Sequence, residues 1–282
     1  MLKKKYTLLN NILQGSTYDK SLFTRLIIIF YVVLSAGCTG KIPVTRPLVG
    51  AQQIQAGMLL EKLQHRGKID SLDADIAVSW SGYGGKQSFS GTLQAVRTGQ
   101  YRLSILDPLG RPVFLLTVNK NFFTLVDNRQ ARGYTGPVDS SFLHQYIPAA
   151  VSPAVLYSLL TAQLPDISLV NVTGGQGNNR SHYWFAFPCG SVLHRLVEVD
   201  EVSGQLVRQV IRDKKTTLLE VIYKGFQGET GQLSLPVRLL INSKNLPGSV
   251  ELVMKKVFPN KIFPDSLFTI AVPKYYQMSR VE

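Results

Sequence analysis

The sequence is poor in the residues that build metal sites and disulfide frameworks. Two cysteines among 282 residues cannot form a disulfide scaffold or a four-thiolate metal site. None of the histidines has a second histidine or a cysteine at metal-ligand spacing. They are His65, His144, His182 and His194. We therefore expect neither a metal nor a cofactor.

Sequence motifs for enzymatic chemistry are also missing. There is no Gly-x-Ser-x-Gly elbow, no Walker loop and no dinucleotide-binding fingerprint. The glycine-rich stretches 82–85 and 174–177 each join two expected strands, which indicates turns. Asp73 and Asp75 share one strand face, and a solvated face explains them better than a catalytic pair. We expect no catalytic residue and no enzyme activity.

Long apolar runs are absent, but the N-terminus has the three parts of a secretion signal. Residues 1–25 carry five basic residues and one acid, and nine apolar residues follow at 26–34. That run is well short of the roughly 20 residues of a transmembrane helix. The next residues, Ser35-Ala-Gly-Cys38, resemble a bacterial lipobox. We predict a signal peptide at 1–37 and a lipidated Cys38, with an uncleaved N-terminal anchor as the alternative.

The basic character of the chain points to a membrane more than to nucleic acid. Lys and Arg number 31 against 18 Asp and Glu, a net charge of +13. Removing the five basic residues and one acid of the signal leaves +9, which suits a protein beside anionic headgroups. The basic residues are dispersed rather than clustered beside aromatics, so no nucleic-acid partner is expected. Thr39 follows the cysteine, and by resemblance to the lipoprotein sorting rule this predicts the periplasmic face of the outer membrane. Cys189 is expected to be a free, buried thiol.

The mature chain divides into a tether and one domain. Residues 38–49 lack periodicity and contain two prolines, so we predict a flexible tether. From Gly50 to Gly67 the spacing of Ile54, Met58, Leu59 and Leu63 predicts a helix. The apolar face of this helix fits packing on a core or lying on a membrane surface. Residues 50–282 are predicted to form a single domain.

After Gly67 the apolar period changes from helical to alternating, which predicts strands. Expected strands begin at Leu72 and recur across the chain, interrupted by two short helices at 140–147 and 152–164. Short strands joined by tight turns imply antiparallel pairing. We predict about ten strands, mainly β, forming an incomplete, half-open antiparallel barrel. The helical insert at about 140–165 and the helix at 50–67 would cover the open side.

Two stretches resemble a known family. The first is Tyr101 to Gly136, with Asp107-Pro-Leu-Gly110, Leu125-Val-Asp-Asn128 and Tyr134-Thr135; the second runs from Tyr146-Ile-Pro148 to Leu164-Pro165. Both resemble the outer-membrane lipoprotein receptor family LolB, and the C-terminal stretch from Asn260 to Pro273 is similar to related lipoproteins and to the periplasmic carrier family LolA. The resemblance implies a half-barrel that holds the acyl chains of lipoproteins. It also implies an exposed hydrophobic residue in a loop, here Leu109; the alternative is a turn leucine folded back onto the sheet.

The sequence predicts a monomeric, non-enzymatic lipoprotein with an apolar cavity, and the resemblance implies that this cavity accepts lipoproteins from a periplasmic carrier and passes them to the outer membrane. The predicted acyl-chain lining is Leu72, Ile76, Val78, Trp80, Leu103, Ile105, Leu115, Leu156, Leu160, Phe185, Val237 and Leu239. The competing interpretation is a structural or assembly adaptor whose half-barrel is filled by its own side chains.

Overall fold

The computed structural model describes residues 45–82, 85–164, 172–177, 181–189, 193–213, 216–228 and 234–282. These residues belong to one compact unit with the bounds Pro43–Glu282. The predicted signal peptide, Cys38 and the side chain of Cys189 lie outside the described part of the chain. Within the described residues, no helix is both long and apolar enough to span a bilayer.

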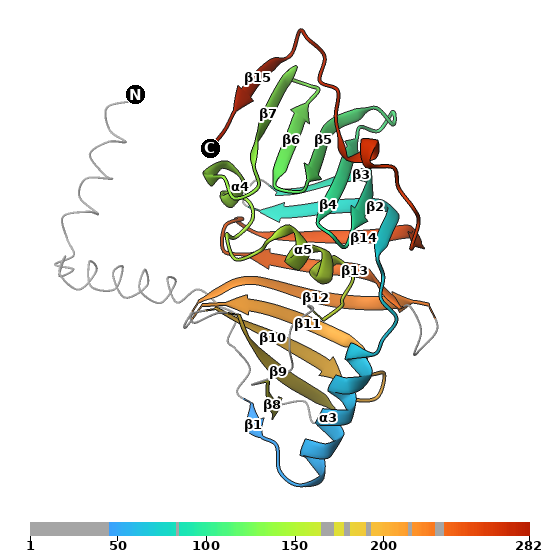
Figure 1. Cartoon of the computed structure of the whole chain (residues 1–282), viewed down its shortest axis with the longest axis vertical. Coiled ribbons are helices and arrows are strands. Elements are labelled where there is room, and N and C mark those ends of the chain that lie inside the picture. The colour runs from blue at the N-terminus through green and yellow to red at the C-terminus, as the bar shows by residue number, and fades with distance from the viewer. Residues whose placement is uncertain are drawn as a thin grey trace, which may run out of the picture. The chain divides into compact units, whose positions relative to one another are not determined.

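The described residues form a single large sheet (Figure 1). Its strands are β1 (Arg46–Pro47), β2 (Ser71–Gly82), β3 (Gly85–Val96), β4 (Gln100–Leu106), β5 (Pro112–Asn119), β6 (Phe122–Asp127), β7 (Arg132–Pro137), β8 (Thr173–Gln176), β9 (His182–Cys189), β10 (Leu193–Asp200), β11 (Leu206–Arg212), β12 (Thr217–Gln227), β13 (Leu235–Ser243), β14 (Ser249–Pro259) and β15 (Gln277–Arg280). Their order is β1-β8-β9-β10-β11-β12-β13-β14-β2-β3-β4-β5-β6-β7-β15. All neighbours are antiparallel except β15, which runs parallel to β7. β1 and β15 end the sheet without pairing with each other, so it stays open.

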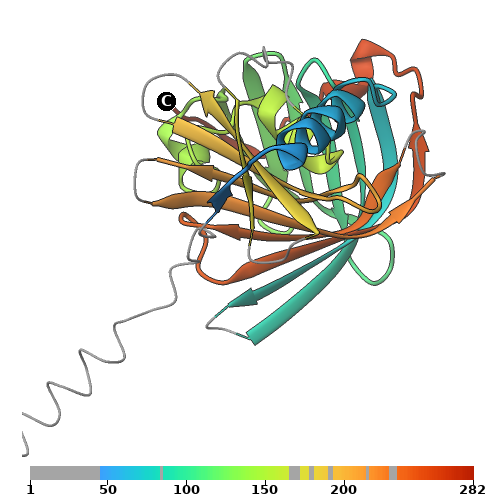
Figure 2. The same cartoon turned by 90° about the horizontal axis from the view of Figure 1, so that it is seen from below.

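Three α-helices and one 3-10 helix accompany the sheet in the described residues. They are α3 (Ala51–Gln64), α4 (Ser141–His144), α5 (Pro153–Leu160) and η1 (Asp265–Phe268). Ser152 caps α5 by accepting a hydrogen bond from the Val155 backbone N–H at 3.3 Å, and Pro153 takes the first helical position. The sheet curves, and α3, α4 and α5 lie on its concave side (Figure 2). The predicted fold class, a mainly β half-open barrel covered by helices, is confirmed.

Two local expectations differ from the structure. Residues 45–49, predicted to be tether, belong to the compact unit, because β1 pairs with β8 and Leu48 is buried. The glycine-rich stretch at 174–177 is strand β8 over most of its length rather than a turn. A Cβ at Gly174 would lie 2.8 Å from Leu48 Cδ1, and one at Gly175 would lie 2.7 Å from Thr45 Cβ. These glycines therefore give the N-terminal segment room to pack against the sheet edge.

Helix α3 is also rotated relative to the sequence prediction. Leu59 and Leu63 face the sheet and are buried, together with Ala56 and Leu60. Ile54 and Met58, predicted on the same apolar face, are exposed.

Candidate functional site

Strand register brings most of the predicted lining residues onto one face of the sheet. Val78 pairs with Leu252, which pairs with Leu239 on β13. On the other side of β2, Leu72 and Ile76 pair with Ala95 and Gly91, which in turn pair with Tyr101 and Ile105 on β4. Since directly paired residues in a ladder point to the same side, and side chains alternate along each strand, Trp80, Leu103 and Val237 share this face.

Phe185 joins the same face across the other half of the sheet. It pairs with Val197, which pairs with Gln209, and Gln209 pairs with Val221. Val221 in turn pairs with Ile241, two residues from Leu239. The concave face thus runs without a break from β9 to β5.

Leu115 is the exception among the predicted strand residues, and its assignment is corrected here. It pairs with Ser104 on β4 and with Val126 on β6, which places it on the convex face. Its neighbour Leu116 pairs with Leu103 and packs against the core instead. The run Phe114-Leu-Leu116 is apolar on both faces, so alternation alone could not choose between the two leucines.

The concave residues divide into two groups by burial. Five of the predicted residues are buried in the main core: Leu72, Ile76, Leu160, Phe185 and Leu239. Six others are half-buried: Val78, Trp80, Leu103, Ile105, Leu156 and Val237. Leu72, Ile76 and Leu239 share the core cluster with Tyr157 and Leu159 of α5 and are at most 1% exposed, so a ligand can reach them only if that packing opens. Phe185 is also buried, but it lines an open cleft.

Helix α5 is the element that closes the centre of the concave face. Three tyrosine hydroxyls hold it: Tyr157 donates to the Ile69 carbonyl at 2.9 Å, Tyr223 donates to the Leu159 carbonyl at 2.7 Å, and Tyr101 donates to the Pro153 carbonyl. Burial raises the pKa of all three phenols well above its ordinary value. We refer to α5 with these three tyrosines as the α5 cover.

A buried polar cluster supports the α5 cover from the sheet. Arg195 and Gln209 both lie on the concave face and are almost completely buried. The Arg195 guanidinium donates to Gln209 Oε1 from Nε at 2.7 Å and to Ser158 Oγ from Nη2 at 3.0 Å. Gln209 Nε2 also donates to the Ser158 carbonyl at 3.5 Å. Arg195 and Gln209 were not identified from the sequence; the signal that could have found them is a polar residue at an inward-facing position of each of two neighbouring strands.

An apolar cleft opens at the edge of the concave face, beneath α3. Its volume is about 410 Å³, within the range of small-molecule pockets. It is lined by Pro47, Leu48, Gln53, Ala56, Gly57, Leu60, Val172, Thr173, Gly174 and Phe185. Phe185 is the predicted lining residue that it reaches. Pro47, Leu48 and Gly174 were missed because residues 45–49 were predicted to be tether and 174–177 a turn. Four further lining residues lie on the helix predicted at 50–67, which was not assigned to the cavity: Gln53, Ala56, Gly57 and Leu60.

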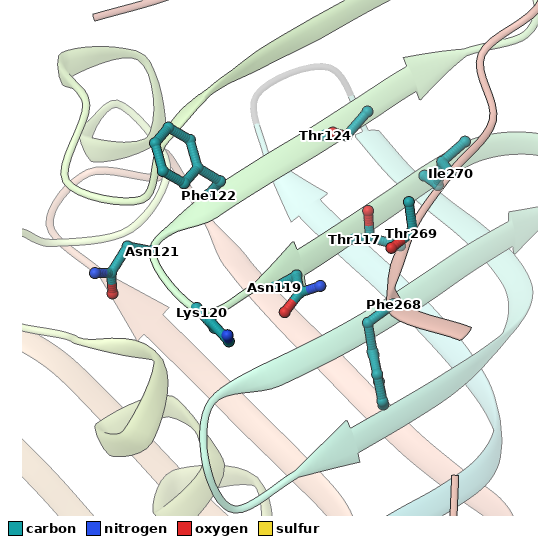
Figure 3. Close-up of a pocket in the computed structure, with 9 residues that line it drawn as sticks. All are labelled: Thr117, Asn119, Lys120, Asn121, Phe122, Thr124, Phe268, Thr269 and Ile270. Carbon is teal, nitrogen blue, oxygen red and sulfur yellow. The ribbon is translucent and has the colours of Figure 1, made fainter. Parts of the chain in front are cut away.

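A second groove lies on the convex face. It has a volume of about 450 Å³ and lies between the β5–β6 hairpin and the segment that follows η1 (Figure 3). Thr117, Asn119, Asn121 and Thr124 line it together with Phe122, Phe268 and Ile270. No predicted lining residue belongs to it.

The Asp107–Arg111 turn presents Leu109 to solvent. The Asp107 carboxylate accepts hydrogen bonds from the backbone N–H groups of Leu109 and Arg111, both at 2.9 Å, and pairs with the Arg111 guanidinium at 2.8 Å. These interactions lower the pKa of Asp107, and the hydrogen bond from the Arg111 backbone N–H has the largest effect. Gly110 supplies the left-handed conformation, with φ of +79°. Leu109 is 77% exposed, so it is not folded back onto the sheet.

Titratable groups gather on the convex face but do not form a metal site. His182 Nδ1 lies 2.8 Å from Glu198, and Arg208 pairs with Glu198 at 3.1 Å and with Glu220 at 3.3 Å. Among the described residues, no group of three or more His, Cys, Asp or Glu side chains has metal-binding geometry. The carboxylates of Glu198 and Glu220 are paired with the guanidinium of Arg208.

Solved structures with a similar architecture are distant in sequence. A LolA superfamily protein from Nitrosomonas europaea matches with a TM-score of 0.50 and 11% identity, covering 76% of this chain and 97% of that one. A DUF1329 family protein from Desulfovibrio piger matches with a TM-score of 0.51 and 9% identity over 77% and 96%. The fold of this chain is similar to that of these two proteins. An outer membrane lipoprotein-sorting protein domain from Vibrio parahaemolyticus also matches, with a TM-score of 0.48 and 8% identity over 76% and 94%. No protein-family model and no curated protein matches the sequence.

Proposed function

We propose that this protein is a lipid-anchored envelope lipoprotein that binds the acyl chains of other lipoproteins within its half-barrel. It would accept them from a periplasmic carrier and insert them into the outer membrane, without enzymatic chemistry. The observation that carries the proposal is the mainly apolar concave face, which runs from Phe185 on β9 to Leu103 on β4 and is interrupted by the paired Arg195 and Gln209. The LolA-like fold supports it, as does the apolar cleft beneath α3.

The energy of acyl-chain burial is comparable to the cost of opening the α5 cover. Burying an acyl chain with about 15 CH₂ groups is worth on the order of 12 kcal/mol relative to water, at about 0.8 kcal/mol per CH₂. Uncovering Tyr157, Leu159 and Leu160 of α5 costs about 1.5–3 kcal/mol each, and breaking the three tyrosine hydrogen bonds costs about 0.5–1.5 kcal/mol each. An acyl chain that enters from water can therefore offset the opening of this one short helix.

A titration tests the proposal directly. The chain from Thr39 onward contains the whole compact unit and can be studied without its lipid. It would be saturated with a fluorescent hydrophobic probe and titrated with a diacylated lipopeptide. We expect displacement at one lipopeptide per protein. A folded protein that releases no probe would contradict acyl-chain binding.

Leu109 is proposed to enter the membrane during delivery. Replacing Leu109 with Glu should leave folding and lipopeptide binding unchanged and reduce transfer of bound lipoprotein into vesicles. Val202, 88% exposed in the β10–β11 turn, offers a matched control, because Val202→Glu introduces the same charge elsewhere. Equal transfer by Leu109→Glu and wild type would remove this role.

One observation favours the adaptor as a second candidate function. Leu72, Ile76, Phe185 and Leu239 are buried by the protein's own side chains in this conformation. A half-barrel that never opens would act through its outer surfaces. In that case the titration gives no displacement, and amide exchange in α5 is as slow as in the central strands.

A further inference from the structure

Helix α3 carries apolar side chains on two opposite faces. Ala56, Leu59, Leu60 and Leu63 are buried on the sheet side. At 100° per residue, Ile54 and Met58 fall on the opposite side of the helix, where they are 68% and 59% exposed. Val49, just before the helix, is 70% exposed. We call Ile54 and Met58 the outer stripe.

The outer stripe is more than a scatter of surface apolar residues. Single exposed leucines or valines are normal, but residues four apart on a helix are neighbours. Figure 2 shows α3 on the concave side of the sheet, so its second face is turned away from the strands. In the part of the chain that the structure describes, no side chain buries this face. At 100° per residue, Glu61 and His65 fall on the same side, so the exposed apolar part of this face is confined to the N-terminal half of α3.

We propose that the outer stripe docks α3 onto the surface of an anionic lipid bilayer. Residues 45–70 carry four basic residues, Arg46, Lys62, Arg66 and Lys68, against the acids Glu61 and Asp70, and this excess complements anionic headgroups. With 14 residues, α3 is about 21 Å long, too short to span a bilayer but suited to lying in its interface.

The place of the stripe in the chain supports a bilayer rather than another partner. Val49 lies four residues after Thr45, where the described chain begins. If Cys38 is lipidated as the sequence predicts, the seven residues from Cys38 to Thr45 span at most about 25 Å. The anchor would therefore keep the outer stripe within reach of the membrane. The docking itself does not depend on acyl-chain binding.

Docking would place the apolar cleft on the opposite side of α3 from the headgroups, one helix diameter (roughly 10 Å) away. Ala56, Gly57 and Leu60 of the same helix line that cleft. This consequence rests on the proposed function, whereas the membrane contact of Ile54 and Met58 does not.

Site-specific fluorescence on the full-length lipidated protein tests the contact. In a Cys189→Ser background, single cysteines at positions 54, 58, 64 and 109 would carry an environment-sensitive fluorophore. The proteins would be reconstituted into phosphatidylethanolamine–phosphatidylglycerol vesicles containing a doxyl-labelled lipid. Gln64 is an exposed residue of α3 off the stripe and serves as the matched control. We expect at least threefold stronger doxyl quenching at 54 and 58 than at 64.

Each other outcome overturns the proposal. Quenching at 109 without quenching at 54 and 58 would mean that the domain docks through the Leu109 turn alone. A blue shift at 54 and 58 without doxyl quenching, with energy transfer between labelled copies, would assign the stripe to a second copy of the chain. No change at any position would mean that the tether holds the domain away from the bilayer. Circular dichroism checks that each variant is folded. If the variant at position 54 or 58 does not fold, the other still tests the contact. The lipopeptide titration uses no membrane. A failure of acyl-chain binding can therefore be distinguished from a failure of membrane docking.

Discussion

Removing the hydroxyl of Tyr223 tests whether α5 is a movable cover. This hydroxyl donates to the Leu159 carbonyl at 2.7 Å in a fully buried setting. A neutral intramolecular hydrogen bond contributes about 0.5–1.5 kcal/mol. If Tyr223→Phe destabilises the closed state by about 1 kcal/mol, the population with α5 open rises about fivefold.

Two measurements report that opening. Stopped-flow mixing with a fluorescent fatty acid gives the uptake rate, and amide hydrogen exchange gives the opening of residues 153–160. Both should rise about fivefold in Tyr223→Phe. Tyr183→Phe is the matched control, because the Tyr183 hydroxyl donates to Gln55 Oε1 on α3 at 3.4 Å and not to α5.

The reasoning fails if α5 does not move independently. In that case exchange in α5 would rise only as much as exchange in β10–β12, and the uptake rate would stay at the wild-type value. Such a result would favour the self-filled adaptor.

Three further predictions concern packing and charge. Gly91→Ala should lower the free energy of unfolding, measured by urea denaturation, by about 1–3 kcal/mol, because the added Cβ would lie 2.2 Å from the Ser104 carbonyl oxygen. Gly57→Ala should raise it by about 0.5–1 kcal/mol, because a Cβ there has nothing within 4 Å. Equal changes in the two variants would contradict the packing described. Gln209→Leu removes the oxygen that accepts the hydrogen bond from Arg195 Nε, so it should lower the free energy of unfolding by about 1.5–3 kcal/mol in the same assay. A decrease below about 0.5 kcal/mol would contradict a stabilising role for the Arg195–Gln209 pair. The three tyrosines of the α5 cover have raised pKa values, so their contribution to folding stability is complete below about pH 10 and is lost above it. Above that pH, the free energy of unfolding should fall by up to about 4 kcal/mol per pH unit. A rise in tyrosinate absorbance without unfolding would contradict this prediction.

Much of the architecture could be predicted because alternation and helix caps are local signals. Ser152 followed by Pro153 marked the start of α5 correctly, and the alternation from Leu72 to Trp80 identified β2. The strands that were missed lack this pattern. β7 has the sequence Arg-Gly-Tyr-Thr-Gly-Pro, and β1 has only two residues. Their pairing is decided by neighbouring strands, which no local window contains.

The candidate site was less accessible to sequence reasoning, because it depends on register and rotation. A shift of one residue moves a side chain to the other face, and this separates Leu115 from Leu116. A rotation of α3 likewise separates Ile54 and Met58 from Leu59 and Leu63. The polar pair Arg195–Gln209 lies in the interior because the two residues satisfy each other across β10 and β11, which becomes visible only when the strands are paired.

The most direct test of acyl-chain binding uses these two faces of the sheet. A photo-crosslinking phenylalanine derivative would replace Leu103 on the concave face in one variant and Leu115 on the convex face in another; both residues are half-buried. Each variant would be irradiated with a diacylated lipopeptide carrying labelled acyl chains. We predict crosslinks from position 103 and none from position 115. Equal crosslinking from both positions, or crosslinking from 115 alone, would contradict an acyl-chain site within the half-barrel.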